Sequence, residues 1–326
     1  MPYTHVDCFS GPGGFCTGLH AAGFETKVAI EYIKSCVDTY SANHPEVHVI
    51  HSDIREVTAD QILPYIPKEG IDLVTSGMPC ETFSTAGNSS RAAYDDRQFL
   101  FREGIRIAQI VNAKMILFEN VPNIQNKRIA KDSKELVIDY LKKELEEAGY
   151  GNFKEFVLDA SKYGVPQKRF FILASKDSQI DVSQTPVETT PDKEVTVKDA
   201  FIDIPEVIAN TWTENPNYLK EESEYTRLMK NDSFWKRITK EKKLLNHLPM
   251  NHRKNILERF TILQQGEGLK GLFERLTAEE LAEYQSRKVI PKTIYVKRNY
   301  RLKWDEASPT VTSHCLDEFV HPVQPR

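Results

Sequence analysis

The stretch Thr4-His5-Val6-Asp7-Cys8-Phe9-Ser10-Gly11-Pro12-Gly13-Gly14-Phe15 decides the fold of this chain, because an apolar run passes through a glycine-rich turn into a helical pattern. Residues 4–9 predict a strand, and residues 15–22 predict the helix that follows it. Glycines let the backbone turn tightly and approach a ligand before a helix opens. Taken alone, a plain structural turn explains these glycines equally well.

Strand and helix patterns then alternate up to about residue 175, as in βαβ units around a parallel sheet. Short apolar runs predict strands at residues 4–9, 26–31, 47–50, 71–76, 114–119, 153–158 and 169–174. Amphipathic segments predict helices at residues 15–22, 33–43, 97–112 and 133–148. We therefore expect an α/β fold with an open, doubly wound, Rossmann-like sheet.

Acidic residues follow two of these strands, where ligands bind in open α/β sheets. Glu31 stands 24 residues after Asp7, a distance at which a carboxylate commonly accepts hydrogen bonds from a ribose. The glycine spacing differs from the dinucleotide fingerprint, and no Gly-Lys-Ser/Thr of a P-loop follows. An adenosine-containing ligand without a bound pyrophosphate fits better. Asp53 either faces the base of that ligand or caps a helix.

A cysteine and a carboxyl follow two further strands. The first lies in Gly77-Met78-Pro79-Cys80-Glu81-Thr82-Phe83-Ser84, and the second in Phe118-Glu119-Asn120-Val121-Pro122. A thiol and a proton donor in one cleft would suit covalent catalysis on a base ring. We interpret Cys8, Cys16 and Cys36 as small buried residues.

Length and composition set the class of protein. A chain of 326 residues exceeds the usual single domain, so we expect two domains. The five cysteines have neither Cys-x-x-Cys nor Cys/His zinc spacing, which favours a reduced intracellular protein without a metal site. The N-terminus lacks a signal-peptide pattern, and nowhere do 18 apolar residues follow one another, so we expect no membrane association.

Five ordered motifs identify a family. Asp7 to Phe15, Gly77 to Cys80, Asp95-Asp96-Arg97-Gln98-Phe99-Leu100-Phe101, Glu119-Asn120-Val121 and Tyr163-Gly164-Val165-Pro166-Gln167-Lys168-Arg169 occur in the order and approximate spacing of DNA cytosine-5 methyltransferases. The chain resembles this family over residues 4–175 and again over residues 308–322. The resemblance implies a methyltransferase of a restriction-modification system that acts in the cytoplasm on the nucleoid.

The resemblance also implies roles for residues. Cys80 would add to C6 of a flipped-out cytosine, Glu119 would protonate N3, and Arg169 would hold the nucleotide. The methyl donor would be S-adenosyl-L-methionine, with S-adenosyl-L-homocysteine as product. Its pocket would be formed by the glycine turn and the strand ends, namely Phe9, Gly11, Gly13, Gly14, Glu31, Tyr32, Asp53, Ile54, Pro79 and Leu100.

The second half of the chain is the expected DNA reader. We predict a catalytic and cofactor-binding domain at residues 1–175, a target-recognition domain at 176–306, and the start of a return segment at 307–326. Residues 227–259 hold ten Lys/Arg against three Asp/Glu, and residues 287–303 hold seven Lys/Arg and no acid. Residues 287–298 alternate charged and apolar side chains, which suits strands or loops along a groove. Candidate contacts to double-stranded DNA are Ser84, Arg97, Lys297, Arg298 and Thr310, with residues 81–97 as a lid.

Three departures from the family keep alternatives open. Phe171 replaces a second arginine, Glu81 replaces a glutamine, and the chain stops at Arg326 before the late motifs. We therefore expect a truncated or split enzyme completed by a second polypeptide. The alternative activities are a tRNA cytosine-5 methyltransferase and a catalytically weak DNA-binding subunit. The bases read in the target cannot be derived, because that region varies within the family.

Overall fold

The computed structural model describes residues 2–79, 96–130, 133–165, 167–189, 194–211, 217–235, 244, 247–293, 298–311 and 318–325. The chain forms two compact units. The first, here called the sheet unit, comprises Met1–Asp159, Lys168–Val187 and Asp232–Ile238. The second unit comprises Ala160–Gln167, Glu188–Asn231 and Thr239–Arg326. The functional division at residues 175 and 306 stays a prediction.

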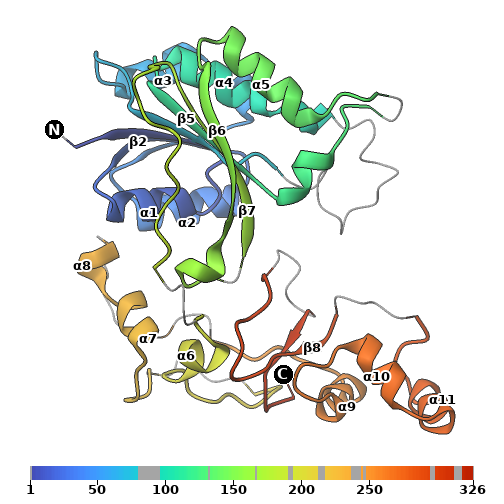
Figure 1. The fold of residues 1–326 in the computed structure, drawn as a ribbon. Helices are drawn as coiled ribbons and strands as arrows, with labels where there is room; N and C mark the ends of the chain where they lie inside the picture. The colour runs from blue at the N-terminus through green and yellow to red at the C-terminus, as the bar shows by residue number, and fades with distance from the viewer. Residues whose placement is uncertain are drawn as a thin grey trace. The chain divides into compact units, whose positions relative to one another are not determined.

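A seven-stranded sheet forms the centre of the sheet unit (Figure 1). Five neighbouring strands are parallel, and the last two in the order form an antiparallel pair. In spatial order the strands are β3 (His48–His51), β2 (Glu25–Glu31), β1 (Thr4–Cys8), β4 (Leu73–Ser76), β5 (Met115–Asn120), β7 (Lys168–Ser175) and β6 (Asn152–Asp159). The predicted α/β class is confirmed, and every predicted strand is present.

The direction of β7 differs from the expected parallel arrangement. This strand runs antiparallel to both β5 and β6. The cause is the connection between β6 and β7, which is limited to residues 160–167. A parallel crossover needs a dozen or more residues, so β7 returns beside β6 as a hairpin and inserts next to β5.

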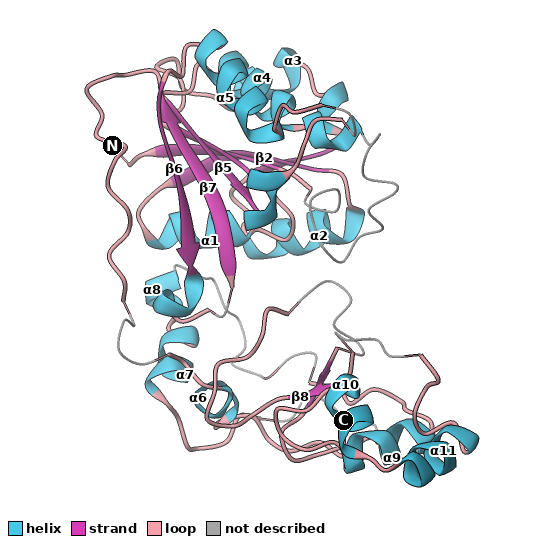
Figure 2. Cartoon of the chain, turned by 45° about the vertical axis from the view of Figure 1, so that its right-hand side comes forward, coloured by secondary structure: helices cyan, strands magenta, loops and turns pink. Residues whose placement is uncertain are grey.

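Helices cover both faces of the sheet (Figures 1 and 2). One face carries α1 (Gly14–Ala21) and α2 (Lys34–Asn43), and the other carries α3 (Ala59–Ile62), α4 (Phe101–Ile110) and α5 (Val137–Glu147). Coverage of both faces explains the apolar strands, because side chains on either side are buried. The core includes Val6, Val28, Val74, Ile116 and Ile172. The helix predicted at 97–112 begins as a 3₁₀ turn, Asp96–Phe99, before α4. A short helix, α8 (Asp232–Trp235), also belongs to this unit.

The second unit contains short helices and little sheet. Its elements are α6 (Val197–Phe201), α7 (Glu224–Met229), α9 (Lys254–Ile262), α10 (Leu269–Arg275), α11 (Ala278–Ser286), β8 (Tyr300–Arg301) and β9 (Phe319–Val320). Phe260, Leu272, Val289 and Ile290 share one buried cluster. Within residues 287–293 the apolar side chains Val289 and Ile290 therefore reflect core packing after α11, and this stretch contains no strand. Within the described parts of the chain, no helix combines the length and apolar character needed to cross a bilayer.

Candidate active site

The crevice expected for ligands lies where the strand order reverses. From β1 the sheet continues on one side to β2 and β3, and on the other side to β4 and β5. The glycine turn follows β1, and Gly77 follows β4 directly. The Gly77 N–H donates to the Cys8 carbonyl at 3.3 Å. Two predicted motifs thus meet at the carboxyl edge of β1 and β4, the usual ligand site of open α/β sheets.

Glycine is required at specific points of the first turn. Gly11 has φ 54°, and Gly13, the residue that caps α1, has φ 101°. A Cβ atom on Gly13 would lie 3.1 Å from the His44 ring and 3.2 Å from Tyr40. Conformation and space therefore both favour glycine at position 13. Phe9 also adopts positive φ, 56°, as the chain leaves β1.

Glu31 ties the glycine turn to the second strand. Its carboxylate accepts hydrogen bonds from the Gly11 N–H at 2.8 Å and from the Ile33 N–H at 2.7 Å. The side chain is buried at the end of β2. A carboxylate has about four acceptor positions, so two backbone bonds orient it and leave capacity for the hydroxyls of a sugar. The structure brings together Glu31 and Gly11, two of the predicted cofactor residues.

The segment after β3 has a structural role of its own. Asp53 caps a 3₁₀ turn by accepting from the Arg55 N–H at 3.0 Å, as the alternative interpretation predicted. Hydrogen bonds from Arg55 hold the pKa of Asp53 below its usual range. Ile54 is buried, and its carbonyl accepts from Arg106 of α4 at 2.6 Å. Tyr32, by contrast, is 70% exposed. Cofactor roles for Tyr32, Asp53 and Ile54 stay predictions.

Glu119 and Arg169 form an ion pair across neighbouring strands. Glu119 Oε1 of β5 lies 2.5 Å from Arg169 Nε of β7, and both side chains are partly buried. Burial raises the pKa of Glu119, and the facing guanidinium offsets part of that rise. Phe171, which pairs with Glu119 in the sheet, stacks on Phe156 with ring centroids 5.5 Å apart. The position expected to hold a second arginine therefore packs against an aromatic ring.

Asn120 connects this carboxyl to the segment before the predicted nucleophile. The Asn120 side chain is buried, and its Nδ2 donates to the Met78 carbonyl at 3.3 Å. This hydrogen bond fixes the end of β5 to the residues that follow β4. Pro79, a predicted cofactor residue in that segment, is partly buried. Sequence reasoning missed this role, although a polar residue ending an apolar strand was a visible signal. Cys80, like Ser84 and Lys297, lies outside the described residues.

The remaining predicted residues are dispersed. Leu100 is partly buried where α4 begins, and Arg97 is exposed in the preceding 3₁₀ turn. Gln98, which belongs to one of the family motifs but had no predicted role, is buried and donates to the Ile129 carbonyl at 2.9 Å. Arg298 is exposed and Thr310 partly buried, both in the second unit. The DNA roles of Arg97, Arg298 and Thr310 stay predictions.

A network of buried polar side chains joins β1 to β4 just before the carboxyl ends of these strands. Thr75 of β4 donates to Asp7 of β1 at 2.7 Å, and the Thr75 hydroxyl also lies 2.8 Å from His5 Nε2. Burial raises the pKa of Asp7 to about 7 and lowers the pKa of His5 to about 3. Both side chains are fully buried, so the network fixes β1 against β4 directly beneath the glycine turn.

Part of the positive charge counted in the second unit is internal. Arg301 is buried and donates to the carbonyl oxygens of His321, at 2.7 Å, and Phe260. Lys288 and Lys292 are exposed. The number of Lys and Arg residues therefore overstates the charge that this unit presents to a phosphate backbone.

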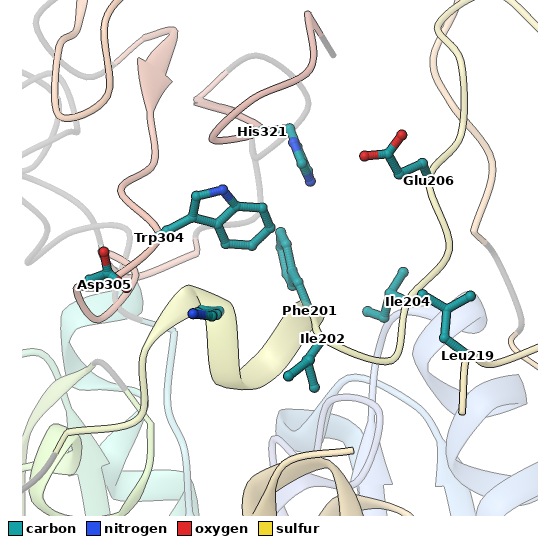
Figure 3. Close-up of a pocket in the computed structure, with 9 residues that line it drawn as sticks. Phe201, Ile202, Ile204, Glu206, Leu219, Trp304, Asp305 and His321 are labelled. Atoms are coloured by element: carbon teal, nitrogen blue, oxygen red, sulfur yellow. The ribbon is translucent and has the colours of Figure 1, made fainter. Parts of the chain in front are cut away.

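The second unit also contains a cavity of about 430 Å³ (Figure 3). In its wall the Phe201 and His321 rings stack with centroids 5.8 Å apart, and Trp304 meets His321 edge-on at 5.4 Å. The Lys198 N–H donates to the Trp304 carbonyl at 2.9 Å, which joins α6 to the chain after β8. None of the predicted site residues lines this cavity.

Known proteins resemble the chain along most of its length. A family model described as C-5 cytosine-specific DNA methylase matches residues 3–312. The chain is 28% identical to the type II methyltransferase M.DdeI of Desulfomicrobium norvegicum, over 98% of this chain and 74% of that protein. It is 30% identical to the type II methyltransferase M1.HphI of Haemophilus parahaemolyticus, over 82% of this chain but only 62% of that protein. A crystal structure described as a DNA modification methyltransferase encoded within an Escherichia coli prophage shares the fold, with a TM-score of 0.70 and 23% identity over 99% of this chain and 85% of that chain.

Proposed function

The chain belongs to the C-5 cytosine-specific DNA methylase family, and on that premise we propose that it methylates C5 of cytosine in duplex DNA within a restriction-modification system. The observation that carries the proposal is the Glu119–Arg169 pair, in which a partly buried carboxyl with a raised pKa lies at the crevice edge of the sheet. The relatives named as type II methyltransferases support the same assignment.

The crevice residues suit S-adenosylmethionine as methyl donor. The glycine turn leaves the backbone open at Gly11 and Gly14, where a Cβ would meet no other atom within 4 Å. Glu31 beside that turn retains acceptor positions for ribose hydroxyls. When bound, S-adenosylmethionine supplies an electrophilic methyl group. Phe9, Gly13, Pro79 and Leu100 would complete the walls of its pocket.

Cysteine chemistry explains how an electron-poor ring is activated. The Cys80 thiolate would form a bond to C6, and the C5–C6 π electrons would shift into the ring and make C5 nucleophilic. A proton from Glu119 on N3 would stabilise the electron-rich ring. After methylation, loss of the C5 proton to a base in solvent and cleavage of the C6–S bond would restore the aromatic ring and the thiolate.

Arg169 and the polar segment 81–97 would hold the extruded base in the crevice. Cytosine C5 lies within the base stack of duplex DNA, so the nucleotide must leave the stack to reach the crevice. Arg169 would bind the nucleotide while orienting Glu119. The segment 81–97, including Ser84 and Arg97, would close over it. The second unit would bind phosphates through exposed cations such as Lys288 and Lys292.

Phe171 gives specific support to a second candidate, a catalytically weak DNA-binding subunit. Its ring stacks on Phe156 and supplies no cationic group to the base. In that case a second polypeptide would complete the enzyme. Under either candidate we place the protein in the cytoplasm on chromosomal DNA.

Transfer of a radiolabelled methyl group separates the candidates. The chain is incubated with labelled S-adenosylmethionine and either mixed-sequence duplex DNA or tRNA, beside a Cys80→Ser variant. Label in duplex DNA that requires Cys80 is the expected result. Label confined to tRNA would favour the tRNA enzyme, and DNA binding without any label would favour the weak subunit.

A further inference from the structure

Helices α1 and α2 cover one face of the sheet (Figure 1). Three side chains that could hold a metal ion, Cys16, His20 and His44, lie close together on this face. Cys16 and His20 stand four residues apart on α1 and therefore share one side of that helix. His44 is the residue that caps the C-terminus of α2. Cys16 and His44 are buried, and His20 is partly buried. These residues come from two separate helices, and none belongs to the predicted cofactor or catalytic set.

The donor atoms lie close enough for one ion. The Cys16 sulfur and one ring nitrogen from each histidine lie within 4.8 Å of one another. Tetrahedral zinc, with bonds of about 2.0–2.3 Å, holds its ligand atoms roughly 3.3–3.8 Å apart. Small side-chain rotations would therefore bring all three donors to bonding distance.

Glu46 supplies a fourth donor atom, an oxygen, beside both histidines. Its Oε1 lies 3.5 Å from His20 Nε2 and 3.8 Å from His44 Nδ1. These two separations match neighbouring vertices of a tetrahedral site, although Glu46 lies outside the group of donors that are all within 4.8 Å of one another, so its side chain would have to rotate to become the fourth ligand. The Glu46 side chain is 49% exposed, so an ion would reach the site from solvent on this side.

The hydrogen bonds of His44 orient its Nδ1 atom toward Glu46. Thr17 Oγ1 donates its single proton to the Gly13 carbonyl at 2.9 Å, so the hydroxyl can only accept from His44 Nε2, 3.2 Å away. The proton of a neutral His44 ring is therefore on Nε2, and the lone pair of Nδ1 faces the Glu46 carboxylate. The nitrogen lone pair and the carboxylate could therefore both bind one cation. His44 is only 5% exposed, so its contacts with Thr17 and Gly13 fix the orientation of the ring.

We propose that Cys16, His20, His44 and Glu46 form a site for Zn²⁺. A thiolate with two imidazoles and a carboxylate is a donor set that zinc accepts, whereas magnesium and calcium prefer oxygen alone. Binding would release the Cys16 thiol proton to solvent as the sulfur–zinc bond forms. Thr26 Oγ1 now accepts the Cys16 S–H hydrogen bond at 3.2 Å, and this bond would be lost when the thiolate forms.

The site would brace the glycine turn. The His44 ring fills the space beside Gly13, where a Cβ would approach it to 3.1 Å. Thr17, which bonds His44, also bonds the Gly13 carbonyl. An ion that holds His44 would therefore hold Gly13, the residue that caps the N-terminus of α1. The site is independent of the proposed methyl transfer, because its ligands contribute no group to the reaction.

Cobalt binding tests the site directly. The full chain, stripped of metal with a chelator, is titrated with Co²⁺ and then with Zn²⁺. We expect one equivalent of Co²⁺ to produce the visible bands of a tetrahedral ion and a near-ultraviolet thiolate charge-transfer band, both removed by Zn²⁺. Cys36→Ser, the matched control, should retain these bands. Absence of a charge-transfer band in the native chain would overturn the proposal.

Two variants assign the ligands. Cys16→Ser should lose the charge-transfer band, and a band that persists in this variant contradicts the assignment. If Cys16→Ser does not fold, His20→Gln provides the test, because His20 is only partly buried. Circular dichroism verifies that this second variant is folded. Loss of this ligand should weaken Zn²⁺ binding by more than the about 10–100-fold typical of residues that only support a ligand. Zinc should raise the Tm of the native chain and not that of His20→Gln, and unchanged zinc affinity in His20→Gln would refute the site.

Discussion

The crevice of the sheet unit and the second unit use charged side chains in opposite ways. At the crevice, Glu31 and Glu119 stand at strand ends, each held by a defined donor and still facing the ligand edge of the sheet. In the second unit, Arg301 is buried in carbonyl contacts while Lys288 and Lys292 face solvent. A charge after a parallel strand therefore indicates function more reliably than a charge within a basic run, because the sheet fixes its direction.

Glu119→Gln should produce the largest loss on the crevice side. Glutamine keeps the shape and a hydrogen-bond donor but cannot transfer a proton, so kcat should fall about 10²–10⁴-fold. Burial raises the pKa of Glu119, so its proton persists to higher pH than usual, and native activity should decline as pH rises through that pKa. Single-turnover methyl transfer across pH measures both effects. Glu147→Gln, on the exposed end of α5, is the matched control. A Glu119→Gln enzyme with native kcat would remove the carboxyl from the mechanism.

Glu31→Gln tests whether the crevice is a cofactor site. The substitution removes a charge that accepts two backbone hydrogen bonds and, by our proposal, those of a ribose. Charged hydrogen bonds contribute about 1.5–3 kcal/mol each, so KM for S-adenosylmethionine should rise about 10–100-fold. Saturating cofactor should restore most of kcat. Steady-state kinetics with DNA in excess measure KM for S-adenosylmethionine. An unchanged KM would show that Glu31 does not bind the ribose of the cofactor.

Arg301→Met tests the internal role of charge in the second unit. Loss of the guanidinium leaves the carbonyls of Phe260 and His321 without their donor, which should destabilise this unit by about 1–3 kcal/mol. Chemical denaturation followed by tryptophan fluorescence measures the effect, since Trp304 belongs to this unit. Native stability in the variant would show that Arg301 is not a structural residue.

The double variant Lys288→Gln, Lys292→Gln should give the smallest effect of the four variants. Unlike Arg301→Met, it should change DNA binding and leave the stability of the second unit unchanged. Each lost phosphate contact lowers the slope of log K against log salt by about 0.9, so DNA binding should become less salt-dependent while stability is retained. Fluorescence anisotropy at several salt concentrations measures the slope. Lys143→Gln on α5 serves as control. An unchanged slope would exclude these lysines from the DNA interface.

Much of the sheet could be predicted from the sequence, because buried strands are continuous apolar runs and their ends are marked by glycine or polar residues. The direction of β7 was missed because periodicity does not encode direction. The signal in the sequence was the short connection after residue 158, which is too short for a parallel crossover. Val289 and Ile290 were interpreted as part of an extended pattern, yet they pack into a helical core.

Contacts between distant residues were equally invisible in the sequence. Asn120 meets Met78, and His5 meets Thr75, across strands far apart in the chain. Cys16, His20 and His44 come from two helices, so no zinc spacing connects them. Glu31 and Glu119 were recognisable because strand ends converge on one edge of a sheet, and that rule needs no knowledge of contacts.

Covalent trapping tests the central claim most directly. A mixed-sequence duplex containing 5-fluorocytosine is incubated with the chain and S-adenosylmethionine, and protein–DNA adducts are separated under denaturing conditions. Fluorine at C5 cannot leave as a proton, so elimination of the thiolate is blocked and the adduct accumulates. We expect an adduct that requires the methyl donor and disappears in Cys80→Ser. An adduct that persists in Cys80→Ser, or native chain that binds the duplex and forms none, would contradict the account.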